Sequence, residues 1–127
     1  MKVIVLGNRG FIGSEIYKHM ESDSDIDCVG FSSKDIDLRD DSSAVPILIK
    51  SIENSVVIFC AGKHRQWSDS PQTMLDNISM INVLLHAAED SLPKHIIFLS
   101  SIETYGIPRD TKISETSSLN PVNRYAI

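Results

Sequence analysis

The sequence predicts an α/β fold in which parallel strands are joined by crossover helices. Apolar runs of four to six residues alternate along the chain with longer segments of helical period, and this alternation is typical of βαβ units. A glycine-rich turn separates the first apolar run from the first helical segment. The 127 residues fit one domain, 1–127, which is long enough to bury a sizeable apolar core.

Four strands are predicted from the apolar runs. They are Lys2 to Leu6, Cys28 to Phe31, Val56 to Cys60 and His95 to Ser100. The third run is continuously apolar, as expected for a parallel strand that is covered on both faces. The expected architecture is therefore a doubly wound parallel sheet.

Three helices are predicted between these strands. They span about Phe11 to Met20, Ser43 to Ile52 and Pro71 to Asp90. On the first helix, the fourfold repeat of Ile12, Ile16 and Met20 predicts the face that packs on the sheet. On the third helix, the predicted apolar side consists of Met74, Ile78, Ile81, Leu84 and Leu85. Segment 106–123 reads as a loop, and Asn123 to Ile127 as the start of another helix.

Composition excludes several classes of function. The net charge is −5, with acids and bases interspersed, which argues against a nucleic-acid partner. Cys28 and Cys60 each lie in a predicted strand, so we expect buried thiols and no disulfide, as suits a cytoplasmic protein. The amino-terminal apolar stretch is too short for a signal peptide or a membrane span. The histidines lack a metal-ligand spacing relative to the cysteines, so no metal site is predicted.

The glycine turn is the strongest functional signal. Gly7, Gly10 and Gly13 form a G-x-x-G-x-x-G pattern between a predicted strand and a predicted helix, the context of a dinucleotide-binding turn in a Rossmann-type sheet. The first glycine permits the tight turn, the second lets the backbone approach a pyrophosphate, and the third allows close contact between helix and strand. The alternative is that the glycines only close the turn.

This spacing and several later motifs resemble the extended short-chain dehydrogenase/reductase family of nucleotide-sugar epimerases, dehydratases and 4-keto-sugar reductases. The resemblance covers the whole chain and rests on the glycine turn, Asp37-Leu38, Ala61-Gly62, Asn77, Ser100-Ser101, Tyr105-Gly106, and Pro121 followed by Tyr125. The residues that it implies in cofactor binding are Gly7, Asn8, Arg9, Gly10, Phe11, Ile12, Gly13, Asp37, Leu38, Ala61 and Gly62. Without the resemblance, Asp37 could be a solvated loop acid and Ala61-Gly62 the end of a strand.

The identity of the dinucleotide depends on the end of the second strand. No carboxylate closes that strand, and the hydroxyls of Ser32 and Ser33 with the Lys34 ammonium could hold a 2′-phosphate, which favours NADP. The alternative is that Lys34 is simply a surface lysine. Asp35 follows immediately and keeps NAD open. The short path from this strand to Asp37 resembles the reductase branch, whose members commonly use NADPH.

The resemblance also implies a catalytic tyrosine, Tyr125, assisted by Ser101, with Asn77 near the substrate. Ser100, at the end of the strand, is the alternative exposed serine. The tyrosine exchanges a proton with the sugar while hydride moves to or from the nicotinamide. A lysine four residues later, at position 129, would stabilise the phenolate. Asn77 could also be a surface residue. Ile102 stands where dehydratases carry an aspartate beside a glutamate, here Glu103, so epimerisation or reduction is favoured over dehydration.

The sequence therefore predicts a Rossmann-type sheet truncated at its C-terminal side, without a substrate domain. Because position 129 lies beyond the chain, we expect the isolated chain to be inactive, whereas the full-length family acts on nucleotide sugars. Self-association through an uncovered sheet face is expected. The alternatives are a catalytically silent dinucleotide-binding module or a decayed remnant. Trp67 could stack on a substrate ring or pack on the protein.

Overall fold

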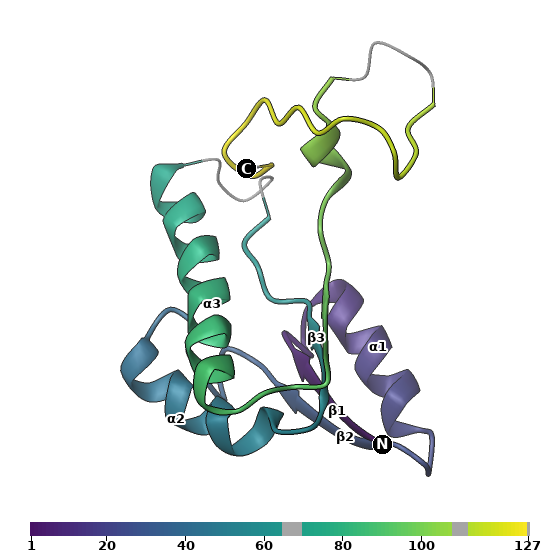
Figure 1. The fold of residues 1–127 in the computed structure, drawn as a ribbon, viewed down its shortest axis with the longest axis vertical. Helices are drawn as coiled ribbons and strands as arrows, with labels where there is room; N and C mark the ends of the chain where they lie inside the picture. The colour runs from purple at the N-terminus through teal and green to yellow at the C-terminus, as the bar shows by residue number, and fades with distance from the viewer. Residues whose placement is uncertain (65–69, 108–111, 127) are drawn as a thin grey trace. The chain divides into compact units, whose positions relative to one another are not determined.

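The computed structural model describes residues 1–64, 70–107 and 112–126, so Trp67 lies outside the described residues (Figure 1). The chain divides into two compact units. One, here called the sheet unit, comprises Met1–Gly62 and Asn77–Leu99. The other, here called the loop unit, comprises Lys63–Asp76 and Ser100–Ile127. Each unit is described by itself.

The sheet unit contains a parallel four-stranded sheet. Its strands are β1 (Lys2–Leu6), β2 (Asp27–Phe31), β3 (Val56–Phe59) and β4 (His95–Phe98). The strand order is β2-β1-β3-β4, and each neighbouring pair is parallel. The predicted α/β class and the parallel, Rossmann-like sheet are confirmed. The carboxyl ends of β1, β2 and β3 consequently meet at one edge of the sheet.

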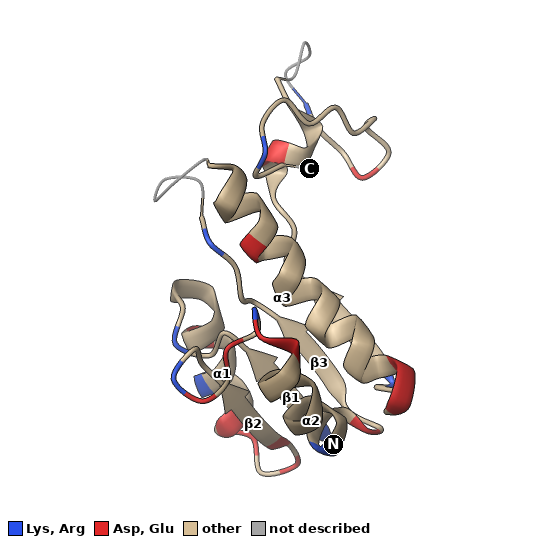
Figure 2. Cartoon of the chain, turned by 90° about the vertical axis from the view of Figure 1, so that its left-hand side faces the viewer, with Lys and Arg blue, Asp and Glu red and all other residues tan. Residues whose placement is uncertain are grey.

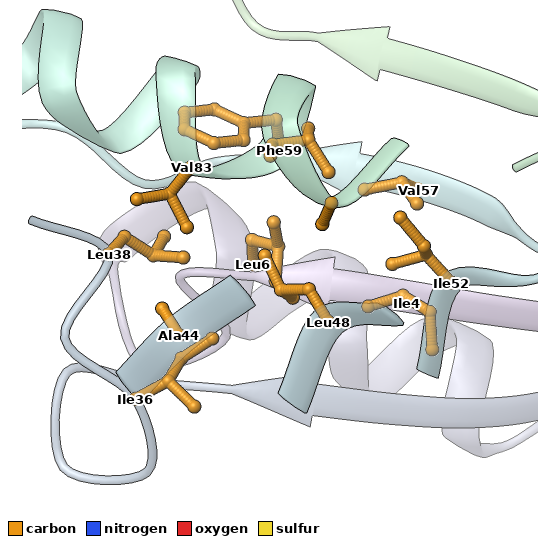
Figure 3. Close-up of a cluster of buried hydrophobic side chains, with 12 residues drawn as sticks. Ile4, Leu6, Ile36, Leu38, Ala44, Leu48, Ile52, Val57, Phe59 and Val83 are labelled. Carbon is orange, nitrogen blue, oxygen red and sulfur yellow. The ribbon is translucent and has the colours of Figure 1, made fainter. Parts of the chain in front are cut away.

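Helices cover both faces of this sheet. Helix α1 (Phe11–Glu21) packs on Val3, Val5 and Ile58 on one face. Helices α2 (Asp41–Ile52) and α3 (Pro71–Asp90) supply the second core on the opposite face. Figure 3 shows the second core, in which Leu6 and Leu48 meet between the sheet and α2. Successive side chains of β1 therefore point alternately into the two cores, as expected for a doubly wound sheet that is covered on both faces.

Helix α2 begins two residues before the predicted start because Asp40 caps it. The Asp40 side chain accepts hydrogen bonds from the Ser42 amide at 3.1 Å and the Ser42 hydroxyl at 2.7 Å. These bonds satisfy a helix-start donor and hold the pKa of Asp40 below its usual value. On the inner face of α2, Ala44, Leu48 and Ile52 are fully buried.

Two predicted packing faces are corrected. On α1, Ile16 and Met20 pack on the core, but Ile12 is 54% exposed because it lies in the first turn, next to the glycine turn. On α3, Ile78 and Leu85 are exposed. Of the predicted positions, Leu84 is buried and Ile81 is partly buried; the other buried positions are Val83 and Ala87. The helix carries apolar residues on more than one side, so periodicity alone does not select the buried stripe.

Three smaller predictions differ from the structure. Cys28 and Cys60 are free thiols, as predicted, but both are only half-buried, and burial raises the pKa of each. A short 3₁₀ helix, η1 (Ile102–Tyr105), occupies a segment without a predicted helix. Arg124 to Ala126 form a turn in place of the predicted helix start, closed by a bond from the Ala126 amide to the Asn123 carbonyl at 3.2 Å. That three-residue spacing is shorter than an α-helical bond.

Candidate functional site

The glycine turn is built by backbone bonds between β1, β2 and α1. The Gly7 amide donates to the Phe31 carbonyl at 2.7 Å, which ties the end of β1 to the end of β2. Gly7 has a φ of +90°, a conformation that glycine adopts without the steric penalty of a side chain. The Gly10 amide then donates back to the Gly7 carbonyl at 2.9 Å. The turn therefore reverses the chain within a few residues and delivers it into α1.

Gly13 and Gly30 allow other groups to approach the backbone closely. A Cβ atom on Gly13 would lie 2.2 Å from the Gly7 carbonyl oxygen, so α1 packs against the turn only without a side chain. A Cβ atom on Gly30 would lie 2.2 Å from Asn8 Nδ2 and 2.7 Å from the Tyr17 ring. Gly30 was missed by sequence reasoning, although a glycine inside a strand signals such an approach.

The start of α1 has the features of an anion site. Within the described part of the chain, no side chain caps this helix start, and Phe11 is 94% exposed. The first amides of a helix lack partners inside the helix and carry the positive end of its dipole. At Gly10, a Cβ atom would meet only the Gly7 carbonyl oxygen, at 3.3 Å, so the backbone remains approachable.

Asn8 adds a second, independent feature. Its Oδ1 atom is buried and, among the described residues, has no hydrogen-bond partner. A buried acceptor without a partner costs free energy unless a ligand or water donates to it. The uncapped amides at the start of α1 therefore suit the pyrophosphate of a dinucleotide, and the buried Asn8 Oδ1 is an acceptor that a ligand or water donor would satisfy.

The end of β2 carries charged groups of both signs. Asp35 turns back to accept hydrogen bonds from the Ser32 amide at 2.8 Å and the Ser32 hydroxyl at 2.6 Å. These bonds, with the cations of Arg9 and Lys34 nearby, lower the pKa of Asp35. Ser33 and Lys34 are exposed at the same strand end. Two cations thus accompany one carboxylate that is already bonded to its own loop.

Asp37 and Leu38 have structural partners. Arg39 donates to both carboxylate oxygens of Asp37, at 2.8 and 2.7 Å. Leu38 is buried in the core under α2. Their predicted place beside an adenine stays a prediction.

Ala61 and Gly62 continue from the end of β3 next to the glycine turn. A Cβ atom on Gly7 would lie 2.8 Å from the Ala61 amide nitrogen. Gly62 is exposed, and a Cβ atom there would lie 3.9 Å from Oδ1 of Asn77. The sheet unit thus brings the glycine turn together with Ala61, and Gly62 together with Asn77, at the carboxyl ends of the strands.

Ser101 lies in the loop unit, where it caps η1. Its hydroxyl accepts a hydrogen bond from the Glu103 amide at 3.2 Å. It also lines a cavity of about 370 Å³. The other residues around this cavity are Ser100, Ile102, Thr104, Tyr105, Ile113, Ser114 and Glu115. Hydroxyl groups thus gather around a hollow that is largely open to solvent.

Tyr125 also lies in the loop unit and is half-buried. Its ring packs against the His64 ring, with 5.2 Å between the ring centroids and a tilt of 52°. His64 belongs to the loop after β3, and sequence reasoning did not select it. No sequence signal connects His64 with a residue 61 positions later, because the contact depends on the path of the loop.

Charge and metal-binding groups are dispersed. Figure 2 shows Lys and Arg interspersed with Asp and Glu along the ribbon. Among residues 1–64, 70–107 and 112–126, no group of three His, Cys, Asp or Glu side chains could hold a metal ion. Over the same residues, no helix combines the length and hydropathy of a membrane span.

Comparison with known proteins identifies a family model and a sequence relative that match this chain. A model of the NAD dependent epimerase/dehydratase family matches residues 3–127. The UDP-glucose 4-epimerase of Lactobacillus helveticus is 27% identical over an alignment 146 residues long. The alignment covers 98% of this chain and 43% of that protein. The chain thus spans less than half the length of this relative.

Solved structures of epimerases and a reductase have a fold similar to that of this chain. The UDP-glucose 4-epimerase from Brucella ovis, in complex with NAD, matches with a TM-score of 0.84 and 25% identity, over 98% of this chain and 43% of that one. A dTDP-4-dehydrorhamnose reductase from Clostridium acetobutylicum has the same fold, with a TM-score of 0.83 and 21% identity, over 99% of this chain and 45% of that one. With its glycine turn between β1 and α1 and a family match over residues 3–127, the chain belongs to the NAD dependent epimerase/dehydratase family.

Proposed function

We propose that this chain is the NAD(P)-binding portion of a nucleotide-sugar epimerase or 4-keto-sugar reductase. The observation that carries the proposal is the start of α1, where no described side chain caps the amides that follow Gly10. The buried, unpartnered Oδ1 of Asn8, a residue of the same glycine turn, supports it. The proposed cofactor contacts come from the glycine turn, Asn8, Arg9, Phe11, Ile12, Ala61 and Gly62. Asp37 and Leu38 would border the adenine.

In this proposal the bound cofactor supplies or accepts hydride. Tyr125 exchanges a proton with the sugar oxygen, and the Ser101 hydroxyl orients that oxygen. Asn77, next to Gly62, would contact the substrate. Ile102, at the position where dehydratases carry an aspartate, favours epimerisation or reduction over elimination of water.

We further propose NADP as the preferred cofactor. The two hydrogen bonds from Ser32 are the main cause of the lowered pKa of Asp35, and the charges of Arg9 and Lys34 add to it, so both cations lie near the end of β2. The exposed Ser33 hydroxyl and Lys34 ammonium would bind the 2′-phosphate. NAD remains the alternative, since it is the cofactor in the family's description and in the Brucella ovis structure.

Calorimetric titration with NADP and NAD tests both proposals. Lys34→Glu should weaken NADP binding at least about tenfold relative to NAD binding, because an attractive charge at the 2′-phosphate is replaced by a repulsive one. Lys94→Glu is the matched control, since it makes the same charge change beside the amino end of β4. Failure of the wild-type chain to bind either dinucleotide would reject the cofactor proposal. An unchanged NADP-to-NAD ratio in Lys34→Glu would reject only the NADP preference.

Strand β4 supports a proposal about self-association. It is an edge strand, and Ile96, Ile97 and Phe98 are all more than one third exposed, on alternating faces. Edge strands present unpaired backbone groups, and adjacent apolar side chains favour pairing with another strand. We propose that a second copy of this chain pairs along β4.

The expected cytoplasmic location stays a prediction.

Sedimentation velocity tests this pairing. The chain should populate dimers or larger species at micromolar concentration, and Ile97→Lys should shift it toward monomer by about tenfold in dissociation constant. Leu92→Lys adds the same charge at an exposed apolar residue outside the strand and should leave the distribution unchanged. A wild-type monomer, or equal effects of both variants, would contradict the proposal.

A further inference from the structure

Glu103 is tied to Ser101 through the backbone of η1. The Glu103 amide donates to the Ser101 hydroxyl at 3.2 Å. The Ser101 carbonyl accepts from the Thr104 amide at 3.2 Å and from the Thr104 hydroxyl at 2.8 Å. The position of Glu103 is therefore fixed relative to the Ser101 hydroxyl.

The Glu103 carboxylate reaches the segment that carries Tyr125. Asn123 Nδ2 donates to Glu103 Oε2 at 2.7 Å, across 20 residues of sequence. The other end of the same amide, Asn123 Oδ1, accepts from the Ala126 amide at 3.0 Å. One side chain thus closes the turn around Tyr125 and joins that turn to η1. Hydrogen bonds to a charged group are stronger than neutral ones.

The Tyr125 ring is supported separately by the loop after β3. His64 packs on it at 5.2 Å between centroids. The neighbouring Lys63 forms an ion pair with Asp76, which also accepts from Gln72 at 2.8 Å. The Asp76 side chain is 12% exposed and the Lys63 side chain 38%, so this attachment of the loop to α3 is partly shielded from water. The turn and the ring therefore have independent supports.

We propose that Glu103 is a positioning residue, whose carboxylate holds the Tyr125 turn in register with Ser101 through Asn123. The inference rests on the proposed function, in which Tyr125 and Ser101 are the reacting and orienting hydroxyls. Two hydroxyls that act on one sugar oxygen must keep a fixed separation, and loop segments 20 residues apart do not provide it by themselves. The bond between Glu103 and Asn123 supplies that constraint.

Nuclear magnetic resonance of the chain, with ¹³C-labelled tyrosine rings, tests this role. The Tyr125 signal is assigned with Tyr125→Phe, and hydrogen exchange of the Ala126 amide reports on the turn. Glu103→Ala should broaden or shift the Tyr125 signal and speed Ala126 exchange about tenfold, because a charge-assisted bond is lost. Glu103→Gln keeps an acceptor oxygen and should retain the wild-type signals. Glu89→Ala, which removes an exposed acid from α3, is the control and should also retain them.

A double-variant cycle with Asn123→Ala completes the test. Asn123→Ala should perturb Ala126 exchange at least as much as Glu103→Ala, because it also removes the Oδ1 acceptor of the Ala126 amide. Adding Glu103→Ala to Asn123→Ala should change little further, as coupled partners require. Additive effects, or a Glu103→Gln variant as perturbed as Glu103→Ala, would overturn the inference. Titration of the same samples with NADP and NAD separates the two proposals. If the wild-type chain binds neither dinucleotide, the proposed cofactor site is rejected. The Tyr125 signal and the Ala126 exchange rate in the Glu103 variants test only the positioning role of Glu103.

Discussion

Replacing Gly13 by alanine should destabilise the chain by about 2 kcal/mol, within the range for overpacking a filled site. The new Cβ atom would lie 2.2 Å from the Gly7 carbonyl oxygen and 3.2 Å from Cys60 Cβ. The Gly7 carbonyl cannot retreat freely, since it accepts the Gly10 amide in the turn. This strain exceeds the gain of about 1 kcal/mol from alanine's better helix propensity. Urea unfolding followed by circular dichroism measures the difference.

Gly10→Ala is the matched comparison, because the same methyl group has only one contact there, at 3.3 Å from the Gly7 carbonyl oxygen. Its unfolding free energy should change by less than about 1 kcal/mol. Its affinity for a dinucleotide should nevertheless fall at least about tenfold, because a methyl group would separate the backbone from the pyrophosphate.

The two glycine variants therefore separate folding from binding. Unchanged stability of Gly13→Ala would contradict the close packing of α1 on the turn. Unchanged dinucleotide affinity of Gly10→Ala would show that the glycines only close the turn, the alternative that the sequence leaves open.

Leu48→Ala should cost about 3 kcal/mol, since truncating a buried leucine removes apolar burial and leaves a cavity. Leu48 is fully buried between α2 and the sheet (Figure 3). Domains of this kind are stable by only about 5–15 kcal/mol, so the loss is a large fraction of the total. The midpoint of urea unfolding should fall, with little change in the slope if the compactness of both states is kept.

Ile47→Ala is the control on the same helix. Ile47 is 36% exposed, and its replacement should cost less than about 1 kcal/mol. Equal losses at positions 47 and 48 would mean that α2 presents a different face to the sheet.

Local sequence patterns predicted the sheet well. Apart from Lys2, the segments that form β1 and β3 are continuously apolar, and the glycine turn predicted where β1 ends and α1 begins. Glycine spacing identifies a backbone approach directly, because only the missing Cβ atom permits it. The candidate cofactor residues at the carboxyl ends of the strands were therefore accessible from sequence and from family resemblance.

Features that depend on distant contacts were not accessible. The buried stripe of α3 was misassigned because both Ile78 and Val83 fit a helical period, and only packing on the sheet decides between them. From the sequence, Glu103 had a meaning only as the counterpart of a dehydratase glutamate, and its bond to Asn123 was not predicted because that partner follows 20 residues later. The contact of His64 with Tyr125 likewise depends on the folded path of two loops.

The strand order has a consequence for synthesis of the protein. Strand β1 leaves the ribosome first, yet its neighbours are residues 27–31 on one edge and residues 56–59 on the other. At ribosomal rates the wait for the second neighbour lasts on the order of seconds. During that time Val3, Ile4, Val5 and Leu6, which are all buried in the finished sheet, are exposed on the nascent chain. Strand β1, one of the two inner strands, therefore keeps one side unpaired until β3 has been synthesised.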